Sequence, residues 1–154
     1  MYTILTPPQI EMGSGSLISL KEIIASYETG RVLIVTDRGI RQAGILDRVV
    51  KETGKNAKDL DIFDRVLPNP DIPAMEACGQ VVESNDYALV IGLGGGSPMD
   101  VAKAAAVLPA NGSKIKPLFG RGMIKKPGVP LCLIATTSGT GSEATQAIVV
   151  DDLE

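Results

Sequence analysis

The strongest structural signal in this chain lies at residues 87–100, which read Tyr87-Ala88-Leu89-Val90-Ile91-Gly92-Leu93-Gly94-Gly95-Gly96-Ser97-Pro98-Met99-Asp100. The apolar run 87–91 predicts a buried strand, and the alanine-rich residues 101–108 predict a helix. A glycine-rich turn between a strand and a helix places free backbone N–H groups and the positive end of the helix dipole where a phosphate can lie. Because three consecutive glycines exceed what a tight turn requires, we predict that this loop binds a phosphate.

Residues 97–100 also carry signals for the start of the helix. Ser97 is suited to the N-cap position, Pro98 to the first helical position, and Asp100 to a return bond of the capping-box kind. Capping and phosphate binding compete for the same backbone N–H groups. The alternative interpretation is therefore that the glycines form only a turn and that Ser97 and Asp100 are only caps. A Walker A loop is excluded, because no Ser or Thr follows Lys103.

Outward from this loop, short β-branched runs alternate with amphipathic helical stretches, which is the pattern of an α/β fold with a parallel sheet. We expect strands at 31–36, 60–63, 87–91 and 131–135, and helices at 14–30, 40–53, 71–84 and 101–108. Gly30 and Gly54 are suited to end the first two helices, and Asp71 to cap the third. The run 31–36 is apolar on both faces, which predicts a central strand covered by helices on both sides. The predicted fold class is a doubly wound α/β domain with a mostly parallel, Rossmann-like sheet.

Composition supports one globular domain. The 154 residues are 44% hydrophobic and 21% charged, and the net charge of −3 argues against a nucleic-acid partner. The apolar runs are far shorter than the roughly 20 residues that span a bilayer, so we expect no membrane partner. Residues 1–8 lack the basic and long apolar regions of a signal peptide. We therefore expect a cytoplasmic protein.

The chain contains no histidine and two cysteines. The absence of histidine removes the usual general base, the Ser/His and Cys/His nucleophile pairs, and the commonest metal ligand. Cys78 lies in a helical pattern and Cys132 in an apolar run, so both are expected to be buried thiols of a reducing compartment. Two cysteines without a second pair do not make a zinc site.

Two further segments are candidates for ligand contacts. Asp37 follows the strand at 31–36, where a carboxylate either accepts hydrogen bonds from a ribose diol or caps the next helix. The loop 136–143 reads Thr136-Thr137-Ser138-Gly139-Thr140-Gly141-Ser142-Glu143. Its hydroxyls could bind a phosphate or a nicotinamide carboxamide, or form only a polar turn. It is not a nucleophile elbow, because its serines lack the flanking glycines and no histidine is present.

Charge is distributed unevenly along the chain. Residues 101–142 include six basic residues and no acidic one, which gives this segment a charge of +6 against −9 for the rest. This asymmetry predicts that anions are drawn to that part of the molecule. For any single lysine between Lys114 and Lys126, however, a solvated side chain in a Gly/Pro-rich loop is the simpler interpretation.

Taken together, residues 94–103 and 136–143 closely resemble the iron-dependent (group III) alcohol dehydrogenases. The resemblance extends over almost the whole chain, including Gly13-Ser14-Gly15, Asp37, Pro68-Asn69-Pro70 and the strand-like run 147–150. Glycerol dehydrogenase and dehydroquinate synthase share the fold and the glycine loop, but residues 136–143 are more similar to the alcohol dehydrogenases.

The resemblance implies a cofactor and the residues that bind it. The cofactor would be NAD, with NADP less favoured because of the aspartate at position 37. The implied contacts are Gly95, Gly96 and Ser97 to the pyrophosphate, Asp37 to the adenosine ribose, Asn69 to the cofactor, and Thr136, Thr137 and Thr140 to the phosphate and nicotinamide side. Asp100 and Lys103 also match the motif, and we assign them mainly to support of the loop.

The resemblance also implies parts that this sequence lacks. In the family, one aspartate and three histidines of an all-helical C-terminal domain hold Fe2+ or Zn2+, whereas residues 1–154 contain no histidine. We therefore expect 1–154 to be the NAD(P)-binding domain alone, without a catalytic or metal residue of its own and inactive by itself. In the intact enzyme, a hydride would pass between a small alcohol or aldehyde and nicotinamide, in a possible homodimer. The alternatives are a glycerol dehydrogenase or dehydroquinate synthase-like enzyme, or a stand-alone nucleotide-binding module without enzymatic activity.

Overall fold

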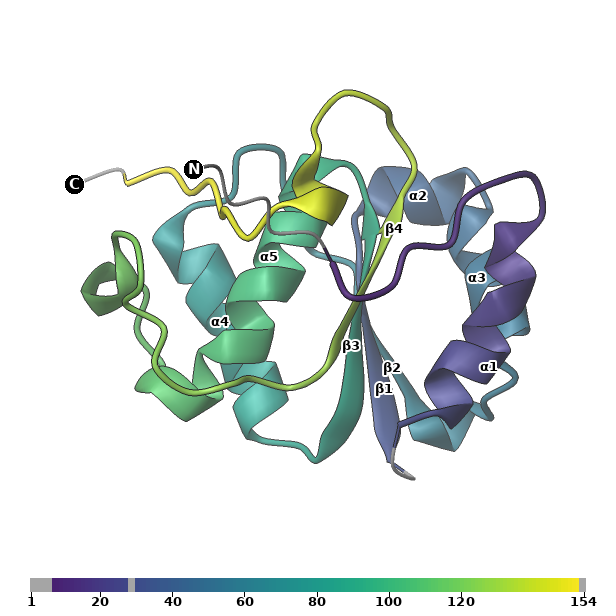
Figure 1. Cartoon of the computed structure of the whole chain (residues 1–154), viewed down its shortest axis with the longest axis horizontal. Coiled ribbons are helices and arrows are strands. Elements are labelled where there is room, and N and C mark those ends of the chain that lie inside the picture. The colour runs from purple at the N-terminus through teal and green to yellow at the C-terminus, as the bar shows by residue number, and fades with distance from the viewer. Residues whose placement is uncertain (1–6, 28–29, 153–154) are drawn as a thin grey trace, which may run out of the picture.

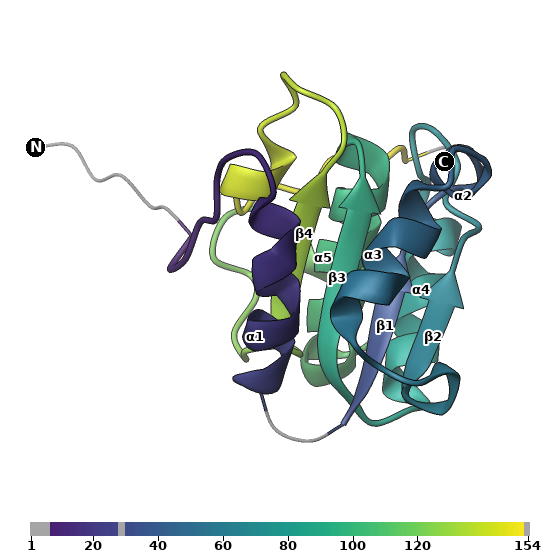
Figure 2. The same cartoon turned by 90° about the vertical axis from the view of Figure 1, so that its right-hand side faces the viewer.

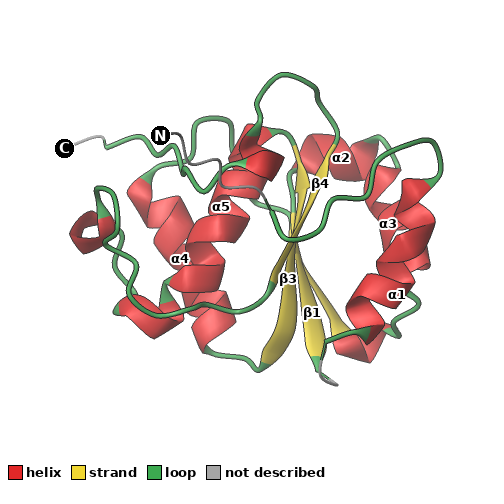
Figure 3. Cartoon of the chain, in the orientation of Figure 1, coloured by secondary structure: helices red, strands yellow, loops and turns green. Residues whose placement is uncertain are grey.

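The chain forms a four-stranded parallel sheet with helices on both faces, as Figures 1 and 3 show for the computed structural model, which describes residues 7–27 and 30–152. The strands are β1 (Arg31–Val35), β2 (Leu60–Phe63), β3 (Tyr87–Gly94) and β4 (Leu131–Ala135). They lie side by side in the order β2-β1-β3-β4, as Figure 2 shows. The predicted doubly wound α/β fold is therefore confirmed.

The described residues form five α-helices: α1 (Leu20–Ala25), α2 (Arg38–Gln42), α3 (Ile45–Thr53), α4 (Ile72–Glu83) and α5 (Gly96–Val107). Helices α1 and α3 pack on one face of the sheet, and α4 and α5 pack on the other (Figure 1). No helix among the described residues is long and apolar enough to cross a membrane.

Each face of the sheet contributes to its own hydrophobic core. Alternate residues of β1 point to opposite sides, so that Val32 and Ile34 pack with α1 and α3 while Leu33 and Val35 pack with α4 and α5. These four side chains are at most 1% exposed, which confirms that β1 is a central strand covered on both faces.

The first two helices differ from the sequence prediction. A 3₁₀ turn at Ser16–Ser19 leads into α1, which ends at Ala25 rather than at Gly30. The second expected helix is divided into α2 and α3 by Gly44, whose φ of 73° is left-handed and interrupts the helix. The predicted cap at Gly54 is confirmed, with a φ of 64°. The predicted cap of α4 is also confirmed, because the Ala74 N–H donates to Asp71 Oδ1 at 2.9 Å.

The start of α5 differs from the prediction in a way that matters for function. Strand β3 continues to Gly94, held by a hydrogen bond from the Thr136 N–H to the Gly94 carbonyl at 2.9 Å. Gly95 is the N-cap and makes no side-chain capping bond, so Ser97 and Pro98 are the second and third helical residues. The predicted Ser97 cap, Pro98 first position and Asp100 return bond are therefore wrong.

Two segments in the last quarter of the sequence differ from the prediction: β4 is less buried than expected, and residues 147–150 are not a strand. Among the described residues, β4 is an edge strand that pairs only with β3, and its five residues are all partly or fully exposed. The strand-like run 147–150 forms no strand, although Asp151 pairs with Asp71 in a single parallel bridge. Cys78 is fully buried, whereas Cys132, on β4, is only partly buried.

The close approach of β3 to α5 can be tested at Gly92. A Cβ there would lie 2.8 Å from the Ala102 Cβ, 2.8 Å from Leu133 Cδ2 and 3.2 Å from the Met99 backbone. We expect Gly92→Ala to lower the free energy of unfolding by about 1–3 kcal/mol, measured by urea denaturation, because the core is overpacked. Gly96→Ala is the matched control, since its Cβ would lie 3.6 Å from Thr140, an ordinary contact. Equal stability of the two variants would contradict the predicted clash.

The two thiols are expected to react slowly in the folded chain. Burial raises the pKa of Cys78 to about 12 and the pKa of Cys132 to about 11. Because the thiolate is the reactive form, we expect alkylation at pH 8–9 to be slow in buffer and to accelerate in urea, where both pKa values return toward their usual range of about 8.5. Cys132→Ala isolates Cys78, which should be the slower of the two. Rapid labelling of Cys78 in that variant without denaturant would contradict its burial.

Candidate functional site

The strand order itself defines where a ligand can bind. The chain proceeds from β1 outward to β2 and from β3 outward to β4 in the opposite direction, so that the order reverses between β1 and β3. In open α/β sheets, ligands bind beyond the carboxyl ends of the strands at such a reversal. Thr36, just after β1, donates from its buried hydroxyl to the Leu93 carbonyl of β3 at 2.9 Å, which fixes the two strand ends together.

The N-terminus of α5 opens onto this edge of the sheet. The first N–H groups of a helix have no intrahelical acceptor, and no side chain caps those of Gly96 and Ser97. Pro98 has no N–H, and no acidic side chain lies in the first turn. The turn therefore presents backbone donors and the positive end of a twelve-residue helix dipole without a competing carboxylate cap.

The threonine-rich loop packs onto the glycine loop. A Cβ on Gly95 would lie 3.1 Å from Thr137 Oγ1, and one on Gly96 would lie 3.6 Å from the Thr140 side chain. The two loops, separated by about 40 residues of sequence, thus form opposite walls at the start of α5. Glycine at position 95 leaves the hydroxyl of Thr137 room beside the backbone.

A cavity of about 210 Å³ lies between these walls. Its lining includes five of the predicted site residues, Asn69, Gly96, Ser97, Asp100 and Thr140, with Ser142, Val149 and Asp151 beside them. Asn69 has a left-handed φ of 51° in the loop before α4. The cavity is smaller than the roughly 300–1,000 Å³ typical of sites for whole drug-sized ligands. It is suited to one part of a dinucleotide, such as a phosphate.

The remaining predicted residues lie around the cavity rather than in its lining. Gly95 and Thr137 face each other where the glycine loop and the threonine-rich loop meet, next to Gly96 in the cavity lining. Thr136 donates its N–H to Gly94, and its buried Oγ1 has no hydrogen-bond partner among the described residues. Asp37 lies on the other side of Gly94, with Oδ2 at 3.5 Å from the position of a Gly94 Cβ.

Asp37 acts as a helix cap in this structure. Its Oδ1 accepts the Ile40 N–H at 2.9 Å and so satisfies the first turn of α2. Of the two roles left open by the sequence, capping is thus observed directly. The second carboxylate oxygen lies toward the strand ends, where a ribose would be expected.

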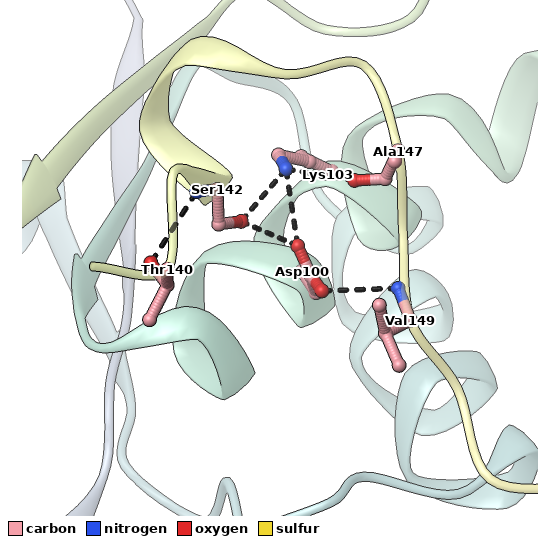
Figure 4. Close-up of polar contacts among 6 residues, drawn as sticks. All are labelled: Asp100, Lys103, Thr140, Ser142, Ala147 and Val149. Carbon is pink, nitrogen blue, oxygen red and sulfur yellow. Dashed lines mark hydrogen bonds and ion pairs between the residues drawn. The ribbon is translucent and has the colours of Figure 1, made fainter.

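Asp100 is buried, and both oxygens of its carboxylate already accept hydrogen bonds from other residues of the chain. Its carboxylate accepts hydrogen bonds from Lys103 Nζ at 3.0 Å, from the Ser142 hydroxyl at 2.5 Å and from the Val149 N–H at 3.0 Å (Figure 4). Sequence reasoning identified Asp100 and Lys103 from the motif but missed Ser142 and Val149. Nothing in the spacing of Gly141-Ser142-Glu143 distinguishes this serine from an exposed turn residue.

The basic segment does not supply a positive wall. Lys103 is paired with Asp100, Lys114 with Glu76 at 2.8 Å, and Lys116 with Asp152 at 3.5 Å. None of the six basic residues lines the cavity, which instead includes Asp100 and Asp151. The predicted attraction of anions to this part of the molecule stays a prediction, and at the cavity the positive feature is the N-terminus of α5.

The described residues do not fit a metal ion. No group of three or more His, Cys, Asp or Glu side chains within 7–27 and 30–152 is arranged to hold one. The carboxylates at the cavity are Asp100, which is paired, and Asp151. No chemical step is therefore assigned to a metal held by these residues.

Comparison with known proteins gives the family. The strand order and the glycine loop define an open, doubly wound α/β domain with a ligand site at the switch point of its sheet. The family model described as iron-containing alcohol dehydrogenase matches residues 7–154. The chain belongs to this family. It is 36% identical over 148 residues to alcohol dehydrogenase 4 of Saccharomyces cerevisiae strain YJM789, covering 96% of this chain and 39% of that protein.

Solved structures of iron-containing alcohol dehydrogenases and related reductases have the same fold as this chain. The alcohol dehydrogenase from Oenococcus oeni superimposes with a TM-score of 0.90 at 30% identity, covering 100% of this chain and 41% of the other. The sulfoacetaldehyde reductase from Bifidobacterium kashiwanohense, solved in complex with NAD+, gives a TM-score of 0.80 at 29% identity, covering 94% and 38%. The chain thus spans about two fifths of the length of these relatives.

The capping role of Asp37 can be separated from any role of its charge. We expect Asp37→Ala to lower the free energy of unfolding by about 1 kcal/mol, because the Ile40 N–H loses its acceptor. Asp37→Ser should recover most of that loss, since serine also caps helices. Urea denaturation measures both, and equal destabilisation by alanine and serine would contradict the capping role.

Proposed function

We propose that residues 1–154 are the NAD(P)-binding half of a metal-dependent alcohol dehydrogenase that interconverts a small alcohol and its aldehyde. One observation carries this proposal: the uncapped N-terminus of α5 faces a cavity at the switch point of the sheet, built from the two loops that the sequence identifies. Membership of the iron-containing alcohol dehydrogenase family supports the reaction class.

In this proposal the pyrophosphate lies at Gly95, Gly96 and Ser97. Its negative charge meets the backbone N–H groups of the first turn of α5, and Thr137 and Thr140 offer hydroxyls from the opposite wall. Asn69 contributes from the far rim of the cavity. Thr136, whose Oγ1 is free among the described residues, provides a further donor or acceptor on the nicotinamide side.

The adenosine ribose lies beside Asp37, outside the cavity. With Oδ1 committed to Ile40, Oδ2 accepts from the ribose diol, and its charge disfavours a 2′-phosphate. The proposal therefore favours NAD over NADP. The relative solved with NAD+ supports a nicotinamide dinucleotide as the cofactor.

The bound nicotinamide supplies the hydride acceptor or donor. The residues of this chain bind and orient the dinucleotide and perform no proton transfer. Fe2+ or Zn2+ and its ligands belong, on this proposal, to an all-helical domain outside residues 1–154. On this proposal, residues 1–154 alone are inactive, because they hold no metal, and they bind the cofactor only weakly. The proposal also places the protein in the cytoplasm.

The test is a titration with NAD and with NADP, followed by calorimetry or by nucleotide fluorescence. The chain is expected to bind NAD more tightly than NADP, and Gly96→Val is expected to weaken NAD binding by at least about tenfold, because its branched side chain enters the phosphate site. Ala57→Val, an exposed substitution in a remote 3₁₀ turn, is the control. Unchanged NAD binding by Gly96→Val would refute the assignment of the phosphate loop.

A further inference from the structure

A buried hydrogen-bonded cluster, called the Asp100 cluster below, is formed by Asp100, Lys103 and Ser142. Lys103 Nζ donates to Asp100 Oδ1 at 3.0 Å, to the Ser142 hydroxyl at 2.7 Å and to the Ala147 carbonyl at 2.8 Å (Figure 4). The Ser142 hydroxyl in turn donates to Asp100 Oδ1. Asp100, Lys103 and Ser142 are each only 6% exposed.

The cluster joins α5 to residues 142–149, which lie about 40 residues later in the sequence. Asp100 and Lys103 lie on α5, Ser142 ends the threonine-rich loop, and the Ala147 carbonyl and Val149 N–H belong to the C-terminal segment. Figure 4 shows the loop and the C-terminal segment converging on the side of α5. Residues 138–140, just before Ser142, are exposed, and the Ser142 N–H donates to Thr140 Oγ1 at 3.3 Å. The cluster thus ties the loop to α5 at Ser142.

The arrangement satisfies the donors of Lys103 and the acceptors of Asp100. The three ammonium donors each have a partner, and both oxygens of Asp100 accept. A buried ion pair that loses one member leaves an uncompensated charge, at a cost of several kcal/mol. Movement of the loop would leave Asp100 and Lys103 paired on α5, but it would break the bonds that each of them makes to Ser142, so both charged groups resist displacement of Ser142 from the helix.

The geometry also removes a conflict at the cavity. Asp100 lines the space where a phosphate would lie, and an unpaired carboxylate there would repel it. Lys103 neutralises that carboxylate from within the protein. The cavity wall formed by Thr140 and Ser142 is held at the same time, because Ser142 is bonded to both members of the pair.

We propose that Asp100 and Lys103 are positioning residues, which hold residues 136–149 over the N-terminus of α5 and so preform the phosphate cavity without contacting the cofactor. This inference rests on the proposed cofactor site. It extends the supporting role that the sequence gives Asp100 and Lys103 from the glycine loop to residues 142–149, which the two side chains contact directly.

The first experiment uses Ser142→Ala, which removes two hydrogen bonds and leaves both charges paired. Hydrogen–deuterium exchange without nucleotide is expected to accelerate about tenfold in residues 138–149, including the Val149 amide, while β1 and α4 stay unchanged. In the same variant the dissociation constant for NAD should rise about tenfold, because the wall is no longer preorganised. Lys114→Met, which breaks an exposed ion pair with Glu76, is the control and should change neither measurement.

The second experiment separates positioning from stability. Asp100→Asn and Lys103→Met are each expected to lower the urea midpoint, and the double variant should recover part of that loss because no buried charge is left unpaired. NAD binding should nevertheless remain weakened in the double variant, since the bonds from Lys103 to Ser142 and to the Ala147 carbonyl are lost. Wild-type affinity in the double variant and in Ser142→Ala would overturn the proposal.

The two proposals fail separately. If the wild-type chain does not bind NAD, the proposed function is wrong, and exchange at residues 138–149 still decides whether the Asp100 cluster holds them. If the wild type binds NAD but Ser142→Ala exchanges and binds like the wild type, the positioning role is wrong and the phosphate loop stands.

Discussion

The close packing of α5 and β4 against Gly92 of β3 is the contact on which the position of the site depends. Helix α5 and strand β4 approach β3 so closely there that a single methyl group would meet both neighbours. This contact holds α5 and β4 close against β3, two residues before the strand ends at Gly94 and α5 begins. Because the helix begins at Gly96, its first free N–H groups point into the cavity instead of being capped by Ser97. The packing at Gly92 therefore helps to place the positively polarised N-terminus of α5 at the cavity.

Most of the architecture could be predicted from the sequence, and the failures have physical causes. The strands at 31–36 and 60–63 and the cap of α4 follow from local pattern and composition, which tertiary contacts reinforce. The first turn of α5 could not be predicted in the same way, because a hydrogen bond from Thr136, forty residues away, extends β3 to Gly94. The split at Gly44 was missed because the apolar periodicity continues through it, whereas the backbone conformation does not.

In the candidate site, too, some residues could be predicted from the local sequence and others depend on contacts between distant segments. Glycines and threonines that approach a ligand through the backbone or through hydroxyls are visible in the sequence as two unusual loops. The partners of Asp100 are not visible, because they depend on how the C-terminal segment lies across α5. The charge count along the sequence likewise does not show that Lys103, Lys114 and Lys116 are each paired with an acidic residue outside the basic segment 101–142. Local charge predicts a field only where the charges are left unpaired.

Strand β4 has a consequence for the behaviour of the chain in solution. Along one side of this strand, among the described residues, the backbone N–H and C=O groups have no neighbouring strand, and the side chains Leu131, Leu133 and Ile134 are only partly covered. An apolar, unprotected edge is a template on which another chain can add a strand. A lysine introduced at the exposed Ala135 would place a charge on this edge and would disfavour the addition of another strand there.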